Sequence, residues 1–185
     1  MNVVRGMGLT ACVALLTVFP VRGDDLASGP EKGARVPALT VHDCTGENKD
    51  KSVDLAALTK DKTAVIALVA ADKFDRPMNR FLKTLDTKVA ADLESVTLAA
   101  VWLTDDEEKT KSFLPRVQTS VQYEKTALTV FNGKDGPKGW NVNSDAHLTV
   151  VLVHKGKVAG RFAYRSVNDA DVPAVLRELK KLAKK

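Results

Sequence analysis

A continuous apolar run followed directly by an amphipathic helix pattern constrains this chain more than any other feature. The run, Thr63–Ala70, has the length of a strand and is rich in β-branched residues. Such a run predicts a strand buried on both faces, usually at the centre of a sheet that helices cover. After a polar joint, apolar residues recur with the spacing of one helical face, at Met78, Phe81, Leu82, Leu85 and Val89. The stretch therefore predicts a strand, a turn and a helix.

The turn between this strand and this helix is the first place to look for function. Ligands and reactive groups gather there in α/β sheets, because the helix N-terminus offers unpaired N–H groups and the positive end of its dipole. The turn is Phe74–Met78, and it contains Asp, Arg, Pro and Met but no nucleophile. The sequence thus argues against covalent chemistry at this position.

The remaining elements follow an alternating order. The patterns predict strands at 36–42, 95–103 and 127–131, a short strand or helical turn at 53–58, helices near 104–121 and 168–182, and a hairpin formed by 148–154 and 157–164. Parallel β-α-β units followed by an antiparallel hairpin and a closing helix predict an α/β fold. Its mixed central sheet should carry helices on both faces.

The first 23 residues have the character of a secretory signal peptide. Arg5 precedes a nearly unbroken apolar run at Leu9–Pro20, and small residues lead to a cut before Asp24. This segment is too short to span a membrane comfortably. We predict a signal peptide at 1–23, a flexible lead-in at 24–33 and one domain at 34–185, exported to the periplasm or the extracellular space.

The two cysteines bear on processing and on redox chemistry. Leu9–Cys12 resembles a lipoprotein cleavage box, but too little apolar chain precedes Cys12, so ordinary cleavage is the preferred interpretation. Cys12 then leaves with the signal peptide, and Cys44 remains as the single thiol. One cysteine cannot close an internal disulfide, so the domain must be held together by its core.

The charge is modest and argues against some partners. The formal net charge is +5, and the basic residues are scattered or lie on the final helix. This distribution does not call for a nucleic-acid partner. No membrane span is expected after signal cleavage.

Three stretches carry a resemblance to a known family. Gly33–Asp43, with Gly46 and Leu55–Leu58, resembles the opening of the exported peroxiredoxin and redoxin branch of the thioredoxin-like superfamily. Val65–Met78 resembles that family's strand and active-site turn. Residues 148–162 and 171–182 resemble that family's terminal hairpin and helix. The likeness covers nearly all of the chain after residue 33, and it implies a three-layer thioredoxin-like sandwich.

The resemblance fails at the positions that carry redox chemistry. Lys73–Met78 falls on the family's x-W-C-x-P-C turn, with Phe74 at the aromatic and Pro77 at the proline. Asp75 and Met78 stand where the two cysteines belong. Thiol–disulfide exchange needs a thiolate and a second sulfur to resolve the mixed disulfide, which a carboxylate and a thioether cannot supply. The family's cis-proline position holds Leu148, or His147 in a register shifted by one.

The resemblance therefore implies a redox-inactive binding or structural module. In redox-active relatives the turn and the proline loop form a groove for an extended peptide. The corresponding surface is predicted at Phe74, Asp75, Arg76, Pro77, Met78, the loop 143–148 with His147 and Leu148, and Trp140. Trp140 equally fits a packed side chain that closes its loop. The expected partner is an extended peptide or another exported protein, and no cofactor or metal is expected.

Two alternatives stay open. Cys44 could serve a thiol oxidoreductase or peroxidase, although it lies in the early strand–turn region and nothing in the sequence lowers its pKa. A weaker alternative is copper or heme-assembly traffic through His42, Cys44 and His147. His42 and Cys44 are two residues apart, so on a strand they share a face.

Overall fold

The computed structural model describes residues 26–184. The predicted signal peptide, including Cys12, lies outside the described residues. Across 26–184, none of the helices has both the length and the apolar character that crossing a bilayer requires.

The elements follow the predicted order, with adjusted ends. In chain order they are β1 (Thr40–Asp43), β2 (Lys51–Asp54), α1 (Leu55–Leu58), β3 (Thr63–Ala70), η1 (Ala71–Lys73), α2 (Arg76–Asp92), β4 (Thr97–Thr104), α3 (Glu107–Val121), β5 (Thr126–Asn132), β6 (Leu148–His154), β7 (Lys157–Tyr164), η2 (Asp169–Asp171) and α4 (Val172–Ala183). The strand predicted at 36–42 begins only at Thr40, because Val36 to Leu39 pair with no neighbouring strand of the sheet.

The strands form one mixed sheet in the order β2-β1-β5-β4-β3-β6-β7. β3, β4 and β5 are parallel, because the helices α2 and α3 return the chain to the same end of the sheet before each new strand begins. β6 is antiparallel to β3, and its register pairs Val69 with Leu148. The apolar run that dominates the sequence is therefore the strand between the parallel and the antiparallel parts of the sheet.

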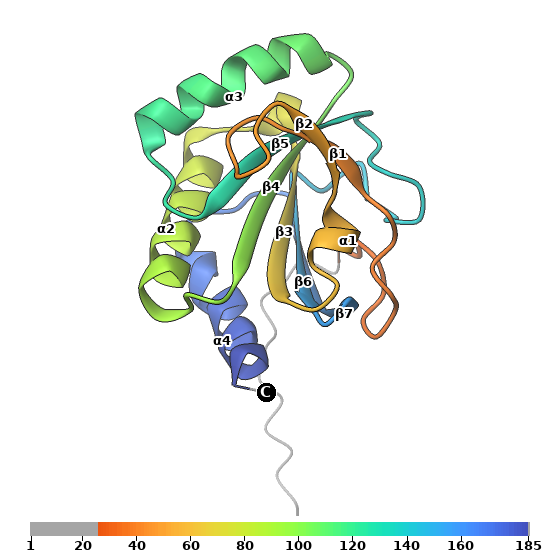
Figure 1. Cartoon of the computed structure of the whole chain (residues 1–185), viewed down its shortest axis with the longest axis vertical. Helices are drawn as coiled ribbons and strands as arrows, with labels where there is room; N and C mark the ends of the chain where they lie inside the picture. Colours follow the sequence, from red (N-terminus) through yellow and green to blue (C-terminus); the bar gives the residue numbers. More distant parts are fainter. Residues whose placement is uncertain (1–25, 185) are drawn as a thin grey trace, which may run out of the picture.

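Two apolar clusters cover the two faces of the sheet. The larger one lies under α2, α3 and α4 and includes Phe81, Leu114 and Val175. The smaller one lies on the other face, where α1 contributes Leu55 and the long β5–β6 loop contributes Trp140. Figure 1 shows α2 and α4 on one side of the sheet and α1 on the other. The predicted sheet with helices on both faces is thus confirmed, although one face has only a single helical turn.

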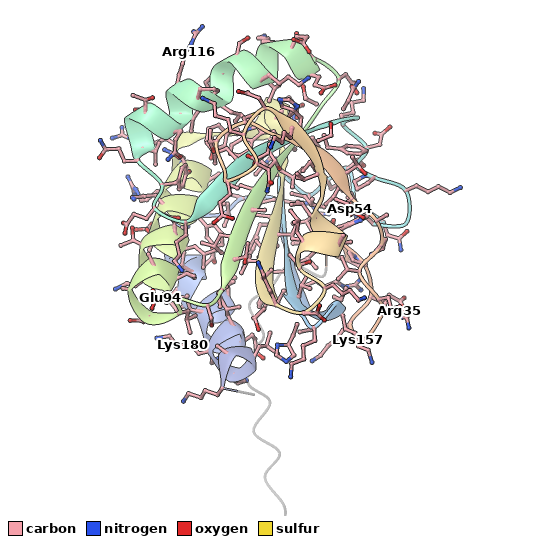
Figure 2. All side chains as sticks on the ribbon, in the orientation of Figure 1. Arg35, Asp54, Glu94, Arg116, Lys157 and Lys180 are labelled. Atoms are coloured by element: carbon pink, nitrogen blue, oxygen red, sulfur yellow. The ribbon has the colours of Figure 1, made fainter. Side chains whose placement is uncertain are left out.

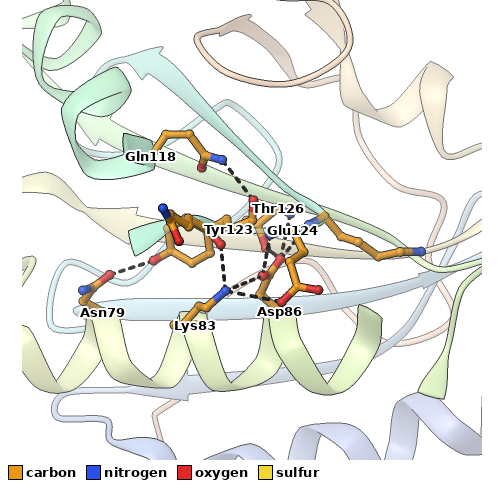
Figure 3. A network of polar contacts seen from close by, with 9 residues as sticks. Asn79, Lys83, Asp86, Gln118, Tyr123, Glu124 and Thr126 are labelled. Carbon is orange, nitrogen blue, oxygen red and sulfur yellow. Dashed lines mark hydrogen bonds and ion pairs between the residues drawn. The ribbon is translucent and has the colours of Figure 1, made fainter. Parts of the chain in front are cut away.

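A buried carboxylate ties α2 to the start of β5. Asp86 is fully buried and accepts hydrogen bonds from the backbone N–H groups of Glu124, Lys125 and Thr126, at 2.8, 2.9 and 2.9 Å. The Thr126 hydroxyl also donates to it, at 2.8 Å, and the Lys83 ammonium lies 3.6 Å away. Figure 3 shows these donors converging on the carboxylate. Because each carboxylate oxygen has partners, its burial is compatible with a stable fold.

Residues 26–33 differ from the flexible lead-in predicted at 24–33. The Ser28 hydroxyl hydrogen-bonds the Thr149 hydroxyl at 2.7 Å, and Arg161 donates to the Gly29 carbonyl at 2.6 Å. Gly29 has φ +88°, and a Cβ there would lie 3.1 Å from Thr149. Glycine therefore lets the backbone pack closely on β6. This part of the chain is part of the domain, because it covers one end of the sheet's second face.

Candidate functional site

The turn after β3 is held by a carboxylate at the start of α2. Asp75 is the N-cap of α2, and its Oδ1 accepts a hydrogen bond from the Met78 N–H at 2.9 Å. Pro77, in the first turn of the helix, has no N–H to satisfy. A carboxylate thus stabilises the helix terminus at the position predicted from the resemblance to correspond to a redox cysteine.

The structure brings most of the predicted groove residues together, but not all are accessible. Asp75, Arg76 and Pro77 are exposed and Phe74 is half-buried, whereas Met78 is buried in the core under α2. The β6 side of the groove lies next to this turn, because the Ala70 N–H donates to the His147 carbonyl at 3.0 Å.

His147 and Leu148 differ in what they can offer at this surface. His147 is half-buried, and Leu148 is fully buried. The accessible part of the predicted groove is therefore formed by Phe74–Pro77 and His147.

Trp140 does not lie in this surface. It is fully buried in the cluster on the opposite face of the sheet, where its Nε1–H donates to the carbonyls of Pro37 and Ala38 at 3.3 and 3.4 Å. The structure contradicts the prediction that Trp140 belongs to the groove. The packed alternative holds, because the β5–β6 loop covers a sheet face that has little helix and needs a large apolar side chain.

Cys44 lies far from the turn. It follows β1, is 3% exposed, and its N–H donates to the Leu128 carbonyl at 3.0 Å. β5 and β4 lie between β1 and β3, so the lateral separation alone is about 14 Å at roughly 4.8 Å per strand. Burial, and then the charge of Asp43, raise the pKa of the Cys44 thiol to about 11. A thiol in this state is not an activated nucleophile.

The three residues of the metal alternative are not brought together. His42 and Cys44 are at β1, whereas His147 precedes β6, and three further strands separate the two sites. Within residues 26–184, no group of three or more His, Cys, Asp or Glu side chains is arranged to hold a metal ion. His42, Cys44 and His147 therefore do not form one metal site.

An aromatic cluster connects the turn with α3, and the sequence analysis did not predict it. The rings of Phe74 and Trp102 meet edge to face with centroids 5.2 Å apart, and those of Phe74 and Phe113 with centroids 6.5 Å apart. Trp102 is buried near the end of β4, whereas Phe113 is 43% exposed on α3. Among the described residues, only Leu58 and Phe113 are large exposed hydrophobic side chains.

A hollow of about 510 Å³ lies beside this cluster. We call it the α3 hollow. It is bounded by η1, the end of β4 and one side of α3, including Ala71, Asp72, Trp102, Lys109, Phe113 and Arg116. The sequence carried a signal for it, since Lys109, Phe113 and Arg116 are spaced four and three residues apart and so share one face of a helix. Helical spacing alone does not tell whether Phe113 is exposed or is buried like the adjacent Leu114.

Solved structures of similar shape are numerous, whereas sequence comparisons find nothing. Neither a family model nor a curated protein matches the sequence. A thiol:disulfide interchange protein from a Bacteroides species has a TM-score of 0.56 at 19% identity, covering 82% of this chain and 91% of its own. A thiol peroxidase from Chromobacterium violaceum has a TM-score of 0.57 at 15% identity, with 88% and 91% covered. A peroxiredoxin-like protein from Aquifex aeolicus has a TM-score of 0.56 at 17% identity, with 86% and 90% covered.

These neighbours confirm the predicted fold. The chain has the thioredoxin-like α/β fold, and its similar structures include redoxin-type proteins. At these identities the likeness is one of architecture, and function has to be argued from this chain's own residues.

Proposed function

We propose that this chain is an exported, redox-inactive thioredoxin-like domain that binds an extended peptide segment of another exported protein. The single observation that carries the proposal is the Asp75 carboxylate at the N-terminus of α2. It occupies a catalytic cysteine position of the resembling family, and it caps the helix through the Met78 N–H. With this position capping the helix, the surface around the turn is proposed to serve binding instead of covalent chemistry.

The accessible turn supports binding at this place. Phe74 presents a half-buried aromatic ring, and the exposed Arg76 and Pro77 lie beside it. His147 lies across from the turn, held by the hydrogen bond between its carbonyl and the Ala70 N–H. An aromatic anchor with polar groups around it is the usual composition of a binding hot spot.

Export is proposed from the N-terminal sequence alone. The pattern of residues 1–23 supports it. Detection of the processed protein outside the cytoplasm, with an N-terminus at Asp24, is the expected result. Retention of residues 1–23 would contradict export.

The binding proposal is tested with a displayed library of random linear peptides. Peptides enriched on the wild-type protein are retested against Phe74→Ala and Arg76→Glu. Leu58→Ala is the matched control, because Leu58 is 44% exposed on α1, on the opposite face of the sheet. We expect at least about tenfold weaker binding for the two turn variants and no change for the control. Equal binding by all three variants would refute a site at the turn.

Redox inactivity is tested separately. Wild type and Cys44→Ser are compared in insulin-disulfide reduction and in peroxide consumption, and both proteins should show only the background rate. Because the Cys44 thiol is buried with its pKa raised to about 11, it is protonated at neutral pH. Turnover by the wild type that disappears in Cys44→Ser would replace the binding proposal with the enzymatic alternative.

A further inference from the structure

We propose that the α3 hollow binds a small organic anion that has an apolar body and a carboxylate group. The carboxylate accepts hydrogen bonds from Trp102 Nε1–H and from Lys109, and the apolar body lies against the Phe113 ring. This inference does not depend on peptide binding at the turn, because it uses different residues.

The first observation is a buried donor without a partner. Trp102 Nε1 is inaccessible to solvent and has no hydrogen-bond acceptor within the described part of the chain. A buried N–H left unpaired costs about 1–3 kcal/mol, so folded proteins rarely keep one without a reason. The fold's other tryptophan shows the usual arrangement, since Trp140 Nε1 donates to two backbone carbonyls.

The second observation is the charge of the lining. Lys109 and Arg116 are exposed on the side of α3 that bounds the hollow, and within residues 26–184 neither forms an ion pair. Figure 2 shows Arg116 extended away from the helix. These two exposed cations at the rim are available to an anion, and the lining also carries the carboxylates of Asp72 and Asp106.

The acceptors of the lining already have partners. Asp106 caps α3 by accepting from the Lys109 N–H at 3.1 Å, and the Asp72 carboxylate lies 3.3 Å from the Lys73 ammonium. The Thr104 hydroxyl oxygen accepts from the Asp106 N–H at 3.0 Å and from the Thr110 hydroxyl at 3.3 Å. Each of these acceptors thus has at least one donor, whereas the Trp102 Nε1–H has no acceptor in the described part of the chain. An occupant that supplies an acceptor satisfies that donor.

The third observation is the apolar part of the hollow. Trp102 and Phe113 line it, and Phe113, 43% exposed, is one of two large exposed hydrophobic side chains among residues 26–184. The volume of about 510 Å³ lies within the range of small-molecule sites. A flat protein surface cannot reach the Trp102 indole, because that side chain is 1% exposed. A small molecule needs less displacement of the lining than a protein surface does to reach the buried Nε1, which favours a free small carboxylate as the occupant.

Nuclear magnetic resonance of the isotope-labelled protein tests this directly. Each tryptophan gives its own indole N–H resonance, and the Trp140→Phe variant assigns the two. We expect phenylpropionate to shift the Trp102 indole resonance in a saturable way and to leave that of Trp140 unchanged. Phenylpropanamide has the same body without the charge, and acetate has the charge without the body. Both should bind at least about tenfold more weakly.

Lysine variants identify the partner of the carboxylate. Lys109→Met keeps the apolar stem and removes the charge, and it should weaken phenylpropionate binding about tenfold. Lys88→Met, a matched change at an exposed position of α2, should leave binding unchanged. An unchanged Trp140 resonance shows that each variant is folded.

Three results would overturn the proposal. These are an unmoved Trp102 resonance at high phenylpropionate concentration, equal binding of the amide, or equal loss in both lysine variants. If no peptide binds at the turn, these three results are unaffected. The two proposals can therefore be refuted independently.

Discussion

The Asp86 network and the α3 hollow lie on the same face of the sheet, and they treat buried polar groups in opposite ways. Asp86 is fully buried and receives four hydrogen bonds, with Lys83 close by (Figure 3). Trp102 is also buried, and its Nε1–H has no acceptor among the described residues. Both side chains belong to the layer between the sheet and the helices.

The Asp86 carboxylate stabilises the fold through its hydrogen bonds, whereas the Trp102 N–H forms none with the described residues. A carboxylate with several donors joins two elements, α2 and the start of β5, and its removal leaves those donors unpaired. A buried N–H without an acceptor destabilises the folded state, and the proposed occupant of the α3 hollow would remove that cost. The comparison predicts large stability effects at Asp86 and small ones around the hollow.

The largest effect is expected for Asp86→Ala. Three backbone N–H groups and the Thr126 hydroxyl lose their acceptor, and the free energy of unfolding should fall by about 3–5 kcal/mol. Urea denaturation measures it. Asp92→Ala, on the exposed end of the same helix, is the control and should hardly move the midpoint. A fall below about 1 kcal/mol would show that the network is not structural.

Cys44 adds a third buried polar group to the comparison. Its surroundings disfavour the charged thiolate form. Its pKa is raised from 9.0 to about 11 by burial first and by Asp43 second. The unfolded chain therefore loses the thiol proton at lower pH than the folded protein does. Stability from this group is complete below pH 9 and lost as the pH rises towards 11, by an amount on the order of 2 kcal/mol. Urea midpoints of Cys44→Ala should fall less than those of wild type over this interval, and parallel curves would contradict the burial of the thiol.

The two tryptophans provide a direct test of the orphan donor. Trp140→Phe removes a hydrogen-bonded N–H, whereas Trp102→Phe removes an unpaired one. Both changes remove similar ring volume from a buried site. We therefore expect Trp140→Phe to cost about 1 kcal/mol more than Trp102→Phe in urea denaturation. An equal or larger cost at Trp102 would show that its N–H has a partner after all.

The smallest effect is expected for Phe113→Ala. Phe113 is 43% exposed, so the unfolding free energy should change by less than about 1 kcal/mol. The adjacent Leu114 is fully buried, and Leu114→Ala should cost about 2–5 kcal/mol. Thermal and urea unfolding of both variants measure the two losses in the free energy of unfolding. A core-sized loss at Phe113 would make it a structural residue and would remove the reason to expect an occupant.

Much of the fold could be predicted because hydrophobic periodicity reports how each element is buried. The run at Thr63–Ala70 became the central strand, and the helical spacing from Met78 became the buried face of α2. Asp75 at the start of that helix became its N-cap, as a carboxylate at that place in the pattern predicts. Element ends moved by a few residues, since local patterns do not define which backbone groups find partners.

The site was predicted only in part. The turn and His147 are neighbours because the β3–β6 register follows from the topology. Trp140 was misplaced because no local pattern tells which face of the sheet a loop covers. The hollow was missed because Trp102 and Phe113 come from different elements, and because the exposure of Phe113 depends on how α3 sits on the sheet.

By itself, the sequence determined the order of the elements, the buried face of each main helix, the single cysteine after residue 23 and the carboxylate at the start of α2. These follow from neighbouring residues, whose spacing sets which side chains share a face. Only the tertiary structure decided that Cys44 is remote from the turn, that Trp140 is core, and that Trp102 keeps an unpaired N–H. Those outcomes depend on contacts between residues far apart in the chain, where packing and hydrogen-bond satisfaction are settled across elements rather than within them.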